Sequence, residues 1–169
     1  MRSPRSRRRV ALPDGAGPGT LAPMRLLLPD LAATEAFGAR LAPLLRPGDA
    51  VLLGGPLGAG KTALARAVLR ALSRDPALDV PSPSYTLVQT YDTALGPVHH
   101  FDLWRLDGPD DVAELGWDEA RDGIVLVEWP DRLGPLAPPD ALRIALHPGA
   151  GEAREAEVQG WPGRLDRLA

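Results

Sequence analysis

The chain has 169 residues, enough for one domain with its own hydrophobic core and too few for two ordinary domains. Hydrophobic residues make up 44% and charged residues 24% of it, with a formal net charge of −3, as in soluble globular proteins; no apolar stretch approaches the roughly 20 residues of a membrane span. The absence of cysteine and the presence of only three histidines exclude disulfides and thiolate metal sites and make a zinc site a poor interpretation. We expect a cytoplasmic protein.

Residues 1–23 predict a disordered basic tail. They hold five arginines and one acid, a formal charge of +4, so residues 24–169 must carry −7 to give the total of −3. Their proline and glycine content opposes regular structure and a packed core. The tail is a functionally neutral segment, a basic nucleic-acid-binding arm, or sequence upstream of a true start at Met24. We expect a single domain over residues 24–169.

From Met24 onward, predicted strands alternate with predicted helices, which favours an α/β fold. The expected strands are residues 25–28, 50–53, 86–91, 98–103, 124–127, 141–147 and 154–158, the last two antiparallel. The expected helices are residues 31–45, after an N-cap at Asp30, then residues 61–73 and a short helix at 110–115. The strands at 50–53 and 124–127 are continuously apolar, as buried parallel strands are.

Residues 55–62, with the sequence GPLGAGKT, match the phosphate-loop pattern of glycine, four residues, then glycine-lysine-serine/threonine. A buried strand precedes the loop and a helix follows it, which is the context that the motif requires. The glycines let backbone N–H groups approach phosphate oxygens closely, and the helix adds the positive end of its dipole. Lys61 would reach the β- and γ-phosphates, and the Thr62 hydroxyl would bind Mg²⁺. The alternative is an ordinary glycine-rich turn. The nucleotide contacts expected from this segment are Gly55, Leu57, Gly58, Ala59, Gly60, Lys61, Thr62 and Ala63.

Lysine occurs once in this chain. All 19 basic residues are arginine except Lys61. An ammonium is a compact point charge and a guanidinium a planar fork, so a site that needs the first cannot accept the second. This exception supports a specific role for Lys61.

Two acidic residues at the ends of predicted strands are candidates for metal binding and catalysis. Glu128 directly follows four aliphatic residues, the arrangement that holds the metal in phosphate-loop proteins. Asp102 lies late in its strand, where it could hold a metal-bound water or orient the attacking water. The alternative for each is a strand-end acid that faces solvent. The expected catalytic residues are thus Lys61, Asp102 and Glu128, and the expected metal site is Thr62, Glu128 and Asp102.

Ser82, Ser84 and Thr86 form a hydroxyl-rich segment between the nucleotide-binding helix and the next strand. Phosphate-loop proteins carry a switch that senses the γ-phosphate at this place. The hydroxyls could instead cap a turn, and both interpretations stay open.

Trp129 follows Glu128 and could stack on a base or a partner, or be a half-buried core residue. The adjacent histidines, His99 and His100, have no serine or cysteine nucleophile in a recognised pattern. We interpret both as strand residues, with His100 near the site.

Five ordered motifs together resemble the TsaE (YjeE) family, the small bacterial ATPases needed to make threonylcarbamoyladenosine in tRNA. They are LGAGKT at 57–62, VPSPSYTLV at 80–88, HFDLWRL at 100–106, ELG at 114–116 and LVEWP at 126–130. The resemblance covers about residues 25–160. It implies a P-loop NTPase-like three-layer α/β fold with a mixed, mainly parallel central sheet and antiparallel strands at the C-terminal side.

The resemblance also implies functional assignments. ATP would be the nucleotide, Thr62 and Glu128 would hold Mg²⁺, Asp102 would be needed for hydrolysis, residues 82–86 would form the switch, and Arg154 would contact the nucleotide. The implied partners are TsaD and TsaB, with tRNA reached through that complex, which ATP hydrolysis would reset between turnovers. Neither a membrane nor DNA is an expected partner. Ser84 stands where the family usually has threonine, which keeps the hydroxyl. Trp104 stands where the family usually has tyrosine, so any role of the tyrosine hydroxyl cannot be carried over to this chain.

Other nucleotide-binding classes can be tested on the sequence. Guanine recognition by GTPases uses an Asn/Thr-Lys-x-Asp element, and this chain has no asparagine and no lysine besides Lys61, which excludes that class. A small-molecule kinase would share the loop and the fold but usually needs an arginine-bearing lid; Arg132 and Arg143 are candidates, although no arginine-rich segment follows Glu128. A module that binds ATP without hydrolysing it is the third alternative.

Overall fold

The computed structural model describes residues 22–168, so the tail proposed at residues 1–23 lies almost wholly outside the described residues. The strands are β1 Met24–Leu28, β2 Ala50–Gly54, β3 Val88–Thr93, β4 Gly96–Asp102, β5 Ile124–Glu128, β6 Leu142–Pro148 and β7 Arg154–Gln159. The α-helices are α1 Leu31–Leu41, α2 Lys61–Ser73, α3 Pro109–Ala113 and α4 Trp117–Ala120. Short 3₁₀ helices occupy Ala42–Leu44, Pro130–Leu136 and Leu165–Arg167.

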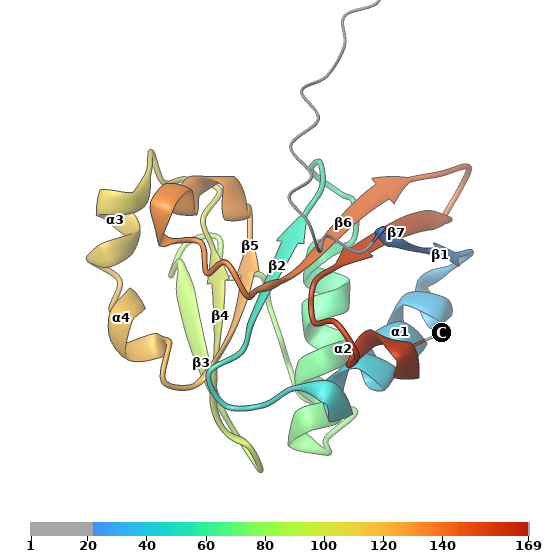
Figure 1. The fold of residues 1–169 in the computed structure, drawn as a ribbon, viewed down its shortest axis with the longest axis horizontal. Coiled ribbons are helices and arrows are strands. Elements are labelled where there is room, and N and C mark those ends of the chain that lie inside the picture. Colours follow the sequence, from blue (N-terminus) through green and yellow to red (C-terminus); the bar gives the residue numbers. More distant parts are fainter. Residues whose placement is uncertain (1–21, 169) are drawn as a thin grey trace, which may run out of the picture.

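The seven strands form one sheet in the order β1-β7-β6-β2-β5-β4-β3 (Figure 1). Strands β6, β2, β5 and β4 run parallel to one another in its centre. Strand β7 is antiparallel to both β6 and β1, and β3 is antiparallel to β4. The expected mixed sheet, with a parallel centre and an antiparallel pair from the last two strands, is confirmed.

Helices cover both faces of this sheet, with α1 and α2 on one side and α3 and α4 on the other (Figure 1). Side chains of β2 alternate between the two layers: Val51 and Leu53 pack with the α1 and α2 side chains, whereas Ala50 and Leu52 pack with those of α3 and α4. Both faces of β2 are therefore buried, which explains its uninterrupted apolar sequence.

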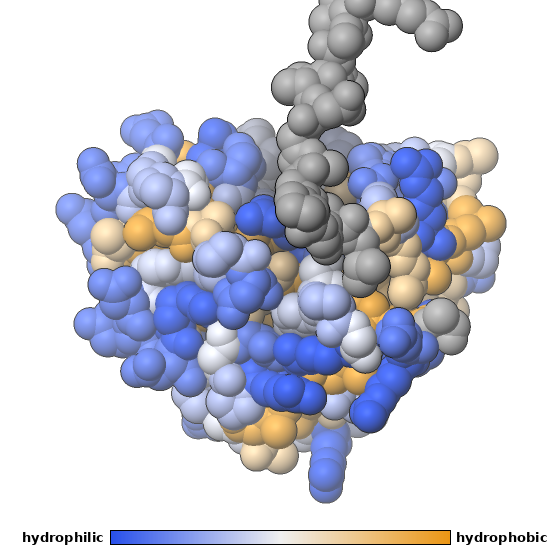
Figure 2. All heavy atoms as spheres, in the orientation of Figure 1, coloured by the Kyte–Doolittle hydropathy of each residue, from blue (hydrophilic) through white to orange (hydrophobic). Residues whose placement is uncertain are grey.

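Hydrophilic side chains predominate on the face of the molecule drawn in Figure 2, where hydrophobic ones form separate patches. Among residues 22–168, no helix combines the length and the apolar character needed to cross a membrane.

The element boundaries differ from the expected ones for local reasons. Helix α1 begins as predicted, because Asp30 Oδ1 accepts a hydrogen bond from the Ala33 amide at 2.8 Å, but it ends at Leu41. Pro43 then imposes a 3₁₀ turn because it has no N–H for the α-helical pattern. Strand β3 begins at Val88 rather than at residue 86, because Leu87 adopts a left-handed φ of 67°. The short helix α4 was not predicted, since four residues carry no readable periodicity.

Candidate functional site

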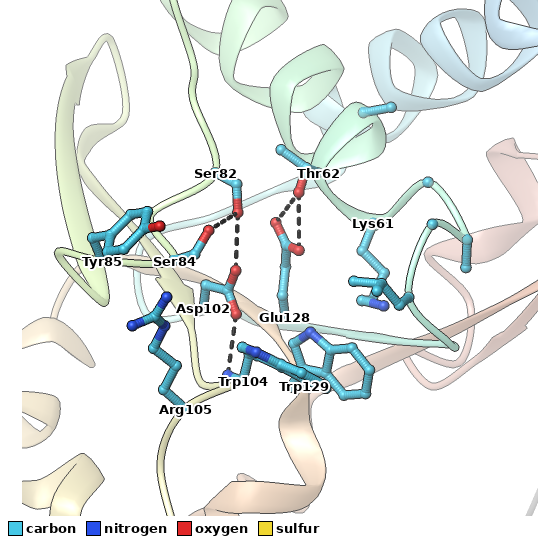
Figure 3. Close-up of a pocket in the computed structure, with 15 residues that line it drawn as sticks. Lys61, Thr62, Ser82, Ser84, Tyr85, Asp102, Trp104, Arg105, Glu128 and Trp129 are labelled. Atoms are coloured by element: carbon cyan, nitrogen blue, oxygen red, sulfur yellow. Dashed lines mark hydrogen bonds between the residues drawn. The ribbon is translucent and has the colours of Figure 1, made fainter.

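The candidate site lies where three parallel strands end. The phosphate loop follows β2, Asp102 ends β4 and Glu128 ends β5, directly opposite Asp102 in the register of the sheet. These segments enclose a cavity of about 450 Å³ (Figure 3). Ligands of α/β sheets usually bind outside the carboxyl ends of the strands. The lining residues are Leu57, Gly58, Ala59, Gly60, Lys61, Thr62, Ala63, Ser82, Ser84, Tyr85, Asp102, Trp104, Arg105, Glu128 and Trp129.

Glycine is required at two points of the phosphate loop. Gly55 has φ 136°, and a Cβ there would lie 2.5 Å from the carbonyl oxygen of Leu146 on β6. Gly60 has φ 101° and immediately precedes α2, with no side chain that caps the helix. The first amides of α2 are therefore available to an anionic ligand, and the positive end of the helix dipole points the same way.

Lys61 is only 4% exposed and points into the loop. Its Nζ donates to the carbonyl oxygens of Gly55 at 2.7 Å and Pro56 at 2.8 Å, and lies 4.1 Å from the ring centroid of Trp129. An ammonium has three donors, so one N–H remains for a ligand oxygen in the cavity. Burial lowers the pKa of Lys61, and the negative charges of Glu128 and Asp102 partly offset that shift.

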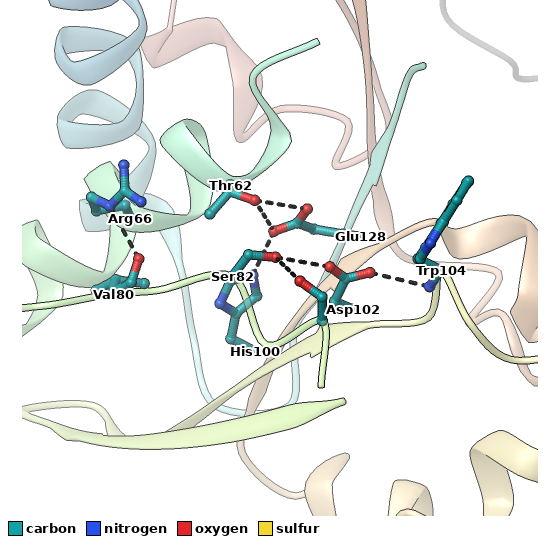
Figure 4. Close-up of polar contacts among 9 residues, drawn as sticks. Thr62, Arg66, Val80, Ser82, His100, Asp102, Trp104 and Glu128 are labelled. Atoms are coloured by element: carbon teal, nitrogen blue, oxygen red, sulfur yellow. Dashed lines mark hydrogen bonds and ion pairs between the residues drawn. The ribbon is translucent and has the colours of Figure 1, made fainter. Parts of the chain in front are cut away.

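Glu128 receives hydrogen bonds from two directions (Figure 4). The Thr62 hydroxyl donates to its Oε1 and Oε2, at 2.9 and 3.0 Å. His100 Nε2 lies 2.8 Å from Oε1, and its ring is fully buried. The carboxylate is thus fixed against the first turn of α2.

Asp102 is held by a separate set of donors. Its Oδ2 accepts from Ser82 Oγ at 2.9 Å and its Oδ1 from the backbone amide of Trp104 at 3.1 Å. Ser82 and Ser84 lie within hydrogen-bond distance of each other, with their Oγ atoms 3.2 Å apart (Figure 3). The hydroxyl-rich segment is therefore connected to one of the two buried acids.

Aromatic side chains line the rest of the cavity. Trp129 adopts a left-handed backbone conformation, φ 59° and ψ 54°, which is uncommon for a bulky residue and frequent at functional sites. Its ring lies 4.7 Å from that of Trp104. The Arg105 guanidinium lies 4.4 Å from the ring centroid of Tyr85, which is 82% exposed. Flat, partly exposed rings of this kind are suited to stacking on a planar ligand.

The oxygen-bearing side chains at the cavity fit a Mg²⁺ ion that is shared with a phosphate ligand better than a metal ion bound by protein side chains alone. Among residues 22–168, no group of three or more His, Cys, Asp or Glu side chains is placed to hold a metal ion. The oxygens of Thr62 and Glu128 lie side by side at the cavity. Mg²⁺ binds oxygen ligands and is usually held by one or two carboxylates together with substrate phosphates.

A match to a family model shows to which family the chain belongs. The family model of the threonylcarbamoyl adenosine biosynthesis protein TsaE matches residues 28–156. The chain belongs to the TsaE family. The predicted resemblance is confirmed, and the phosphate loop agrees with nucleotide binding in this family.

Individual TsaE relatives give the same result. The tRNA threonylcarbamoyladenosine biosynthesis protein TsaE of Rickettsia felis is 36% identical over 122 residues, which cover 72% of this chain and 71% of that protein. Its counterpart in Nostoc sp. is 35% identical over 141 residues, covering 79% and 84%. The crystal structure of Bacillus subtilis YdiB matches with a TM-score of 0.70 and 27% identity, covering 86% of this chain and 90% of that chain.

Most of the residues predicted for this TsaE-family site lie together. Two of the three exceptions are Gly55, which stands at the start of the loop, and the exposed Thr86; neither is among the lining residues. The third is Arg154, whose guanidinium donates to the loop carbonyls of Ala59 and Gly58, at 3.0 and 3.2 Å. Arg154 therefore contacts the phosphate loop and does not line the cavity.

Four residues make contacts at the site that were not predicted: Tyr85, Trp104 and Arg105 line the cavity, and His100, expected only to lie near the site, contacts Glu128. All four lie within the motifs at 80–88 and 100–106, which is the signal that could have identified them. The two arginines considered for a kinase lid, Arg132 and Arg143, are not among the lining residues.

Proposed function

We propose that this protein is a cytoplasmic, Mg²⁺-dependent ATPase that serves the synthesis of threonylcarbamoyladenosine in tRNA. The observation that carries this proposal is the hydrogen bond between Thr62 and Glu128 at the opening of α2. It joins a phosphate-loop hydroxyl to a strand-end carboxylate, beside a buried lysine. Residues 24–169 would act as one ATPase domain.

The charged, hydroxyl-bearing and tryptophan side chains of the cavity have distinct roles in this proposal. The first amides of α2 and the Lys61 ammonium bind the phosphates. Thr62 and Glu128 hold Mg²⁺, which when bound neutralises phosphate charge. Asp102 accepts a hydrogen bond from the attacking water and orients it. Trp129, with Trp104 beside it, offers an aromatic surface for the adenine ring.

Ser82 and Ser84 would report the presence of the γ-phosphate. The Ser82 hydroxyl donates to Asp102 and lies 3.2 Å from the Ser84 hydroxyl, so a phosphate oxygen or a water at the same place competes for these hydrogen bonds. Loss of the γ-phosphate on hydrolysis would let the Ser82–Asp102 contact form again. In this way the nucleotide state changes the surface around residues 82–86.

The proposed partners are TsaD and TsaB, and tRNA is reached through them. Support comes from membership of the TsaE family and from the exposure of Tyr85 beside the cavity. Hydrolysis would reset the partner complex between turnovers, and the isolated protein would hydrolyse ATP slowly.

The test measures ADP and phosphate released from Mg·ATP by the purified protein, with and without TsaD, TsaB and tRNA. Release should rise when the partners are present. The variant Lys61→Ala should lose nucleotide binding, whereas Asp102→Ala should still bind ATP and hydrolyse it at least about 10²-fold more slowly, because the water is no longer oriented.

Three outcomes would contradict parts of this proposal. Phosphate found on a small metabolite would establish the kinase alternative. A hydrolysis rate that does not change when the partners are added would contradict the proposed coupling between ATP hydrolysis and the TsaD–TsaB complex. Loss of ATP binding in Asp102→Ala would show that Asp102 binds the metal and does not orient the attacking water.

A further inference from the structure

His100 is a buried titratable side chain at the site to which the proposed reaction assigns no role. It lies on β4, two residues before Asp102, and its side chain is fully buried. A buried polar ring costs free energy unless its nitrogens are hydrogen-bonded. The polar contact that the ring makes therefore indicates what His100 does.

Only one nitrogen of the ring has a partner within the described part of the chain. Nε2 lies 2.8 Å from Glu128 Oε1, whereas Nδ1 is buried without a partner. A carboxylate oxygen can only accept, so Nε2 carries the proton and donates to Glu128. An unprotonated Nδ1 then leaves no buried N–H without an acceptor, which is the less costly arrangement.

The position of Glu128 depends on this donor. Its carboxylate ends a flexible side chain whose last torsion is broad, and it must present an oxygen beside Thr62. The Thr62 hydroxyl lies at similar distances from both carboxylate oxygens, 2.9 and 3.0 Å, so by itself it does not select one orientation. His100 contacts Oε1 alone and therefore distinguishes the two oxygens.

The other buried acid has no need of His100. Asp102 is held by Ser82 and by the amide of Trp104, and no hydrogen bond joins it to the histidine. The effect of removing His100 should therefore fall on Glu128.

We propose that His100 is the positioning residue of the metal site: its Nε2–H fixes the Glu128 carboxylate in the orientation in which Glu128 and Thr62 would hold the Mg²⁺ of the nucleotide. This inference rests on the proposed function, because it assumes that Glu128 holds the metal. Hydrogen-bond partners of metal-binding carboxylates generally orient them and contribute to metal affinity.

The experiment compares two substitutions in the full-length protein. His100→Phe keeps a flat ring and removes the donor. His100→Gln keeps an N–H donor at about the position of Nε2. His99→Phe is the matched control, since His99 is the neighbouring residue on β4 and its Nδ1 bonds to Thr90 Oγ1 at 2.9 Å instead.

The readout is binding and not turnover. Mn²⁺ replaces Mg²⁺, and its affinity for the protein–ADP complex is measured by electron paramagnetic resonance; binding of a fluorescent ATP analogue in EDTA is measured in parallel. His100→Phe should weaken Mn²⁺ binding about 10- to 100-fold and leave metal-free analogue binding unchanged. His100→Gln should restore most of the Mn²⁺ affinity, and His99→Phe should retain all of it.

The possible outcomes separate this inference from the proposed function. Wild-type Mn²⁺ affinity in His100→Phe, or an equal loss in His100→Phe and His100→Gln, would overturn the role of His100. A wild-type protein that binds the analogue but takes up no Mn²⁺ would overturn the metal site itself. Thermal unfolding of each variant is recorded, and if His100→Phe does not fold, His100→Leu is compared with His100→Gln in its place.

Discussion

At the scale of single residues, the site consists of a few buried polar groups, each with a partner. Lys61, Asp102 and Glu128 are each at most 4% exposed. Charges at such positions are stable only when hydrogen-bonded or paired. The lysine donates to loop carbonyls, and each acid has its own donors. The loop and the strand ends are therefore prepared for a charged ligand before it binds.

We predict that Lys61 titrates below the ordinary lysine pKa of 10.5, because burial disfavours its charged form. Lys61 is the single lysine of the chain, so labelling with [ε-¹³C]lysine gives one signal whose pH dependence can be followed by NMR. Bound ATP should raise the midpoint, because phosphate charge favours the ammonium.

The lowered pKa of Lys61 determines how the stability of the protein and its nucleotide binding each change with pH. Between the lowered pKa and 10.5 the unfolded chain binds more protons than the folded protein, so the ligand-free protein gains stability from Lys61 as the pH rises through this window. Nucleotide binding weakens over the same rise, because the neutral amine no longer attracts phosphate. A titration midpoint of Lys61 at or above 10.5 in the absence of ATP would contradict both of these predicted pH effects.

At the scale of elements, two arginines of α2 hold the segment that leads to Ser82. Arg66 Nε donates to the carbonyl of Val80 at 3.1 Å, and Arg70 Nε to that of Leu78 at 3.0 Å (Figure 4 shows the first). Arg66 lies one helical turn after Thr62. The helix that would hold the phosphates therefore also supports the hydroxyl-rich segment.

The packing of α1 on α2 depends on the absence of a side chain at Gly38. A Cβ there would lie 2.5 Å from the Cβ of Ala67. We predict that Gly38→Ala lowers the free energy of unfolding, because overpacking costs about 1–3 kcal/mol and the better helix propensity of alanine returns only about 1 kcal/mol.

Urea unfolding measures this difference, and Gly108→Ala is the matched control. Gly108 has an extended φ of 179° and no atom within 4 Å of its Cβ position. An unchanged unfolding midpoint in Gly38→Ala would show that the two helices separate without cost.

At the scale of the whole molecule, the last described residues are joined to the beginning of the central strand β2. The guanidinium of Arg164 donates to both carboxylate oxygens of Asp49, with Nη1 3.1 Å from Oδ1, and also to the carbonyl of Leu44. It lies 3.8 Å from the ring centroid of Trp161. The ion pair is mostly buried, with side-chain exposures of 21% and 15%.

We predict that Arg164→Met destabilises the protein by about 2 kcal/mol, because it removes hydrogen bonds to a charged group and leaves Asp49 partly buried without its cation. Thermal unfolding measures the change. The exposed Arg167→Met is the control, and ATP binding at low temperature should be unaffected in both. Equal stability of the two variants would show that the ion pair contributes nothing.

Local patterns of the sequence predicted the elements that carry the site. The apolar runs of β2 and β5, the N-cap at Asp30 and the loop before α2 depend on neighbours in the chain. The weaker predictions were those in which one residue changes the backbone, such as Pro43 at the end of α1 and Leu87 at the start of β3. Hydrophobic periodicity is read over several turns, so it does not show where one such residue ends or delays an element.

The sequence by itself determined the phosphate loop, the two acids at strand ends and the TsaE family, because each of these depends on short spacings along the chain. Only the tertiary structure decided which partners these groups meet. His100 and Glu128 are 28 residues apart and Arg154 and Ala59 are 95 apart. Such pairs form because the order and register of the strands bring them together, and a one-residue change of register would turn each side chain to the other face of the sheet.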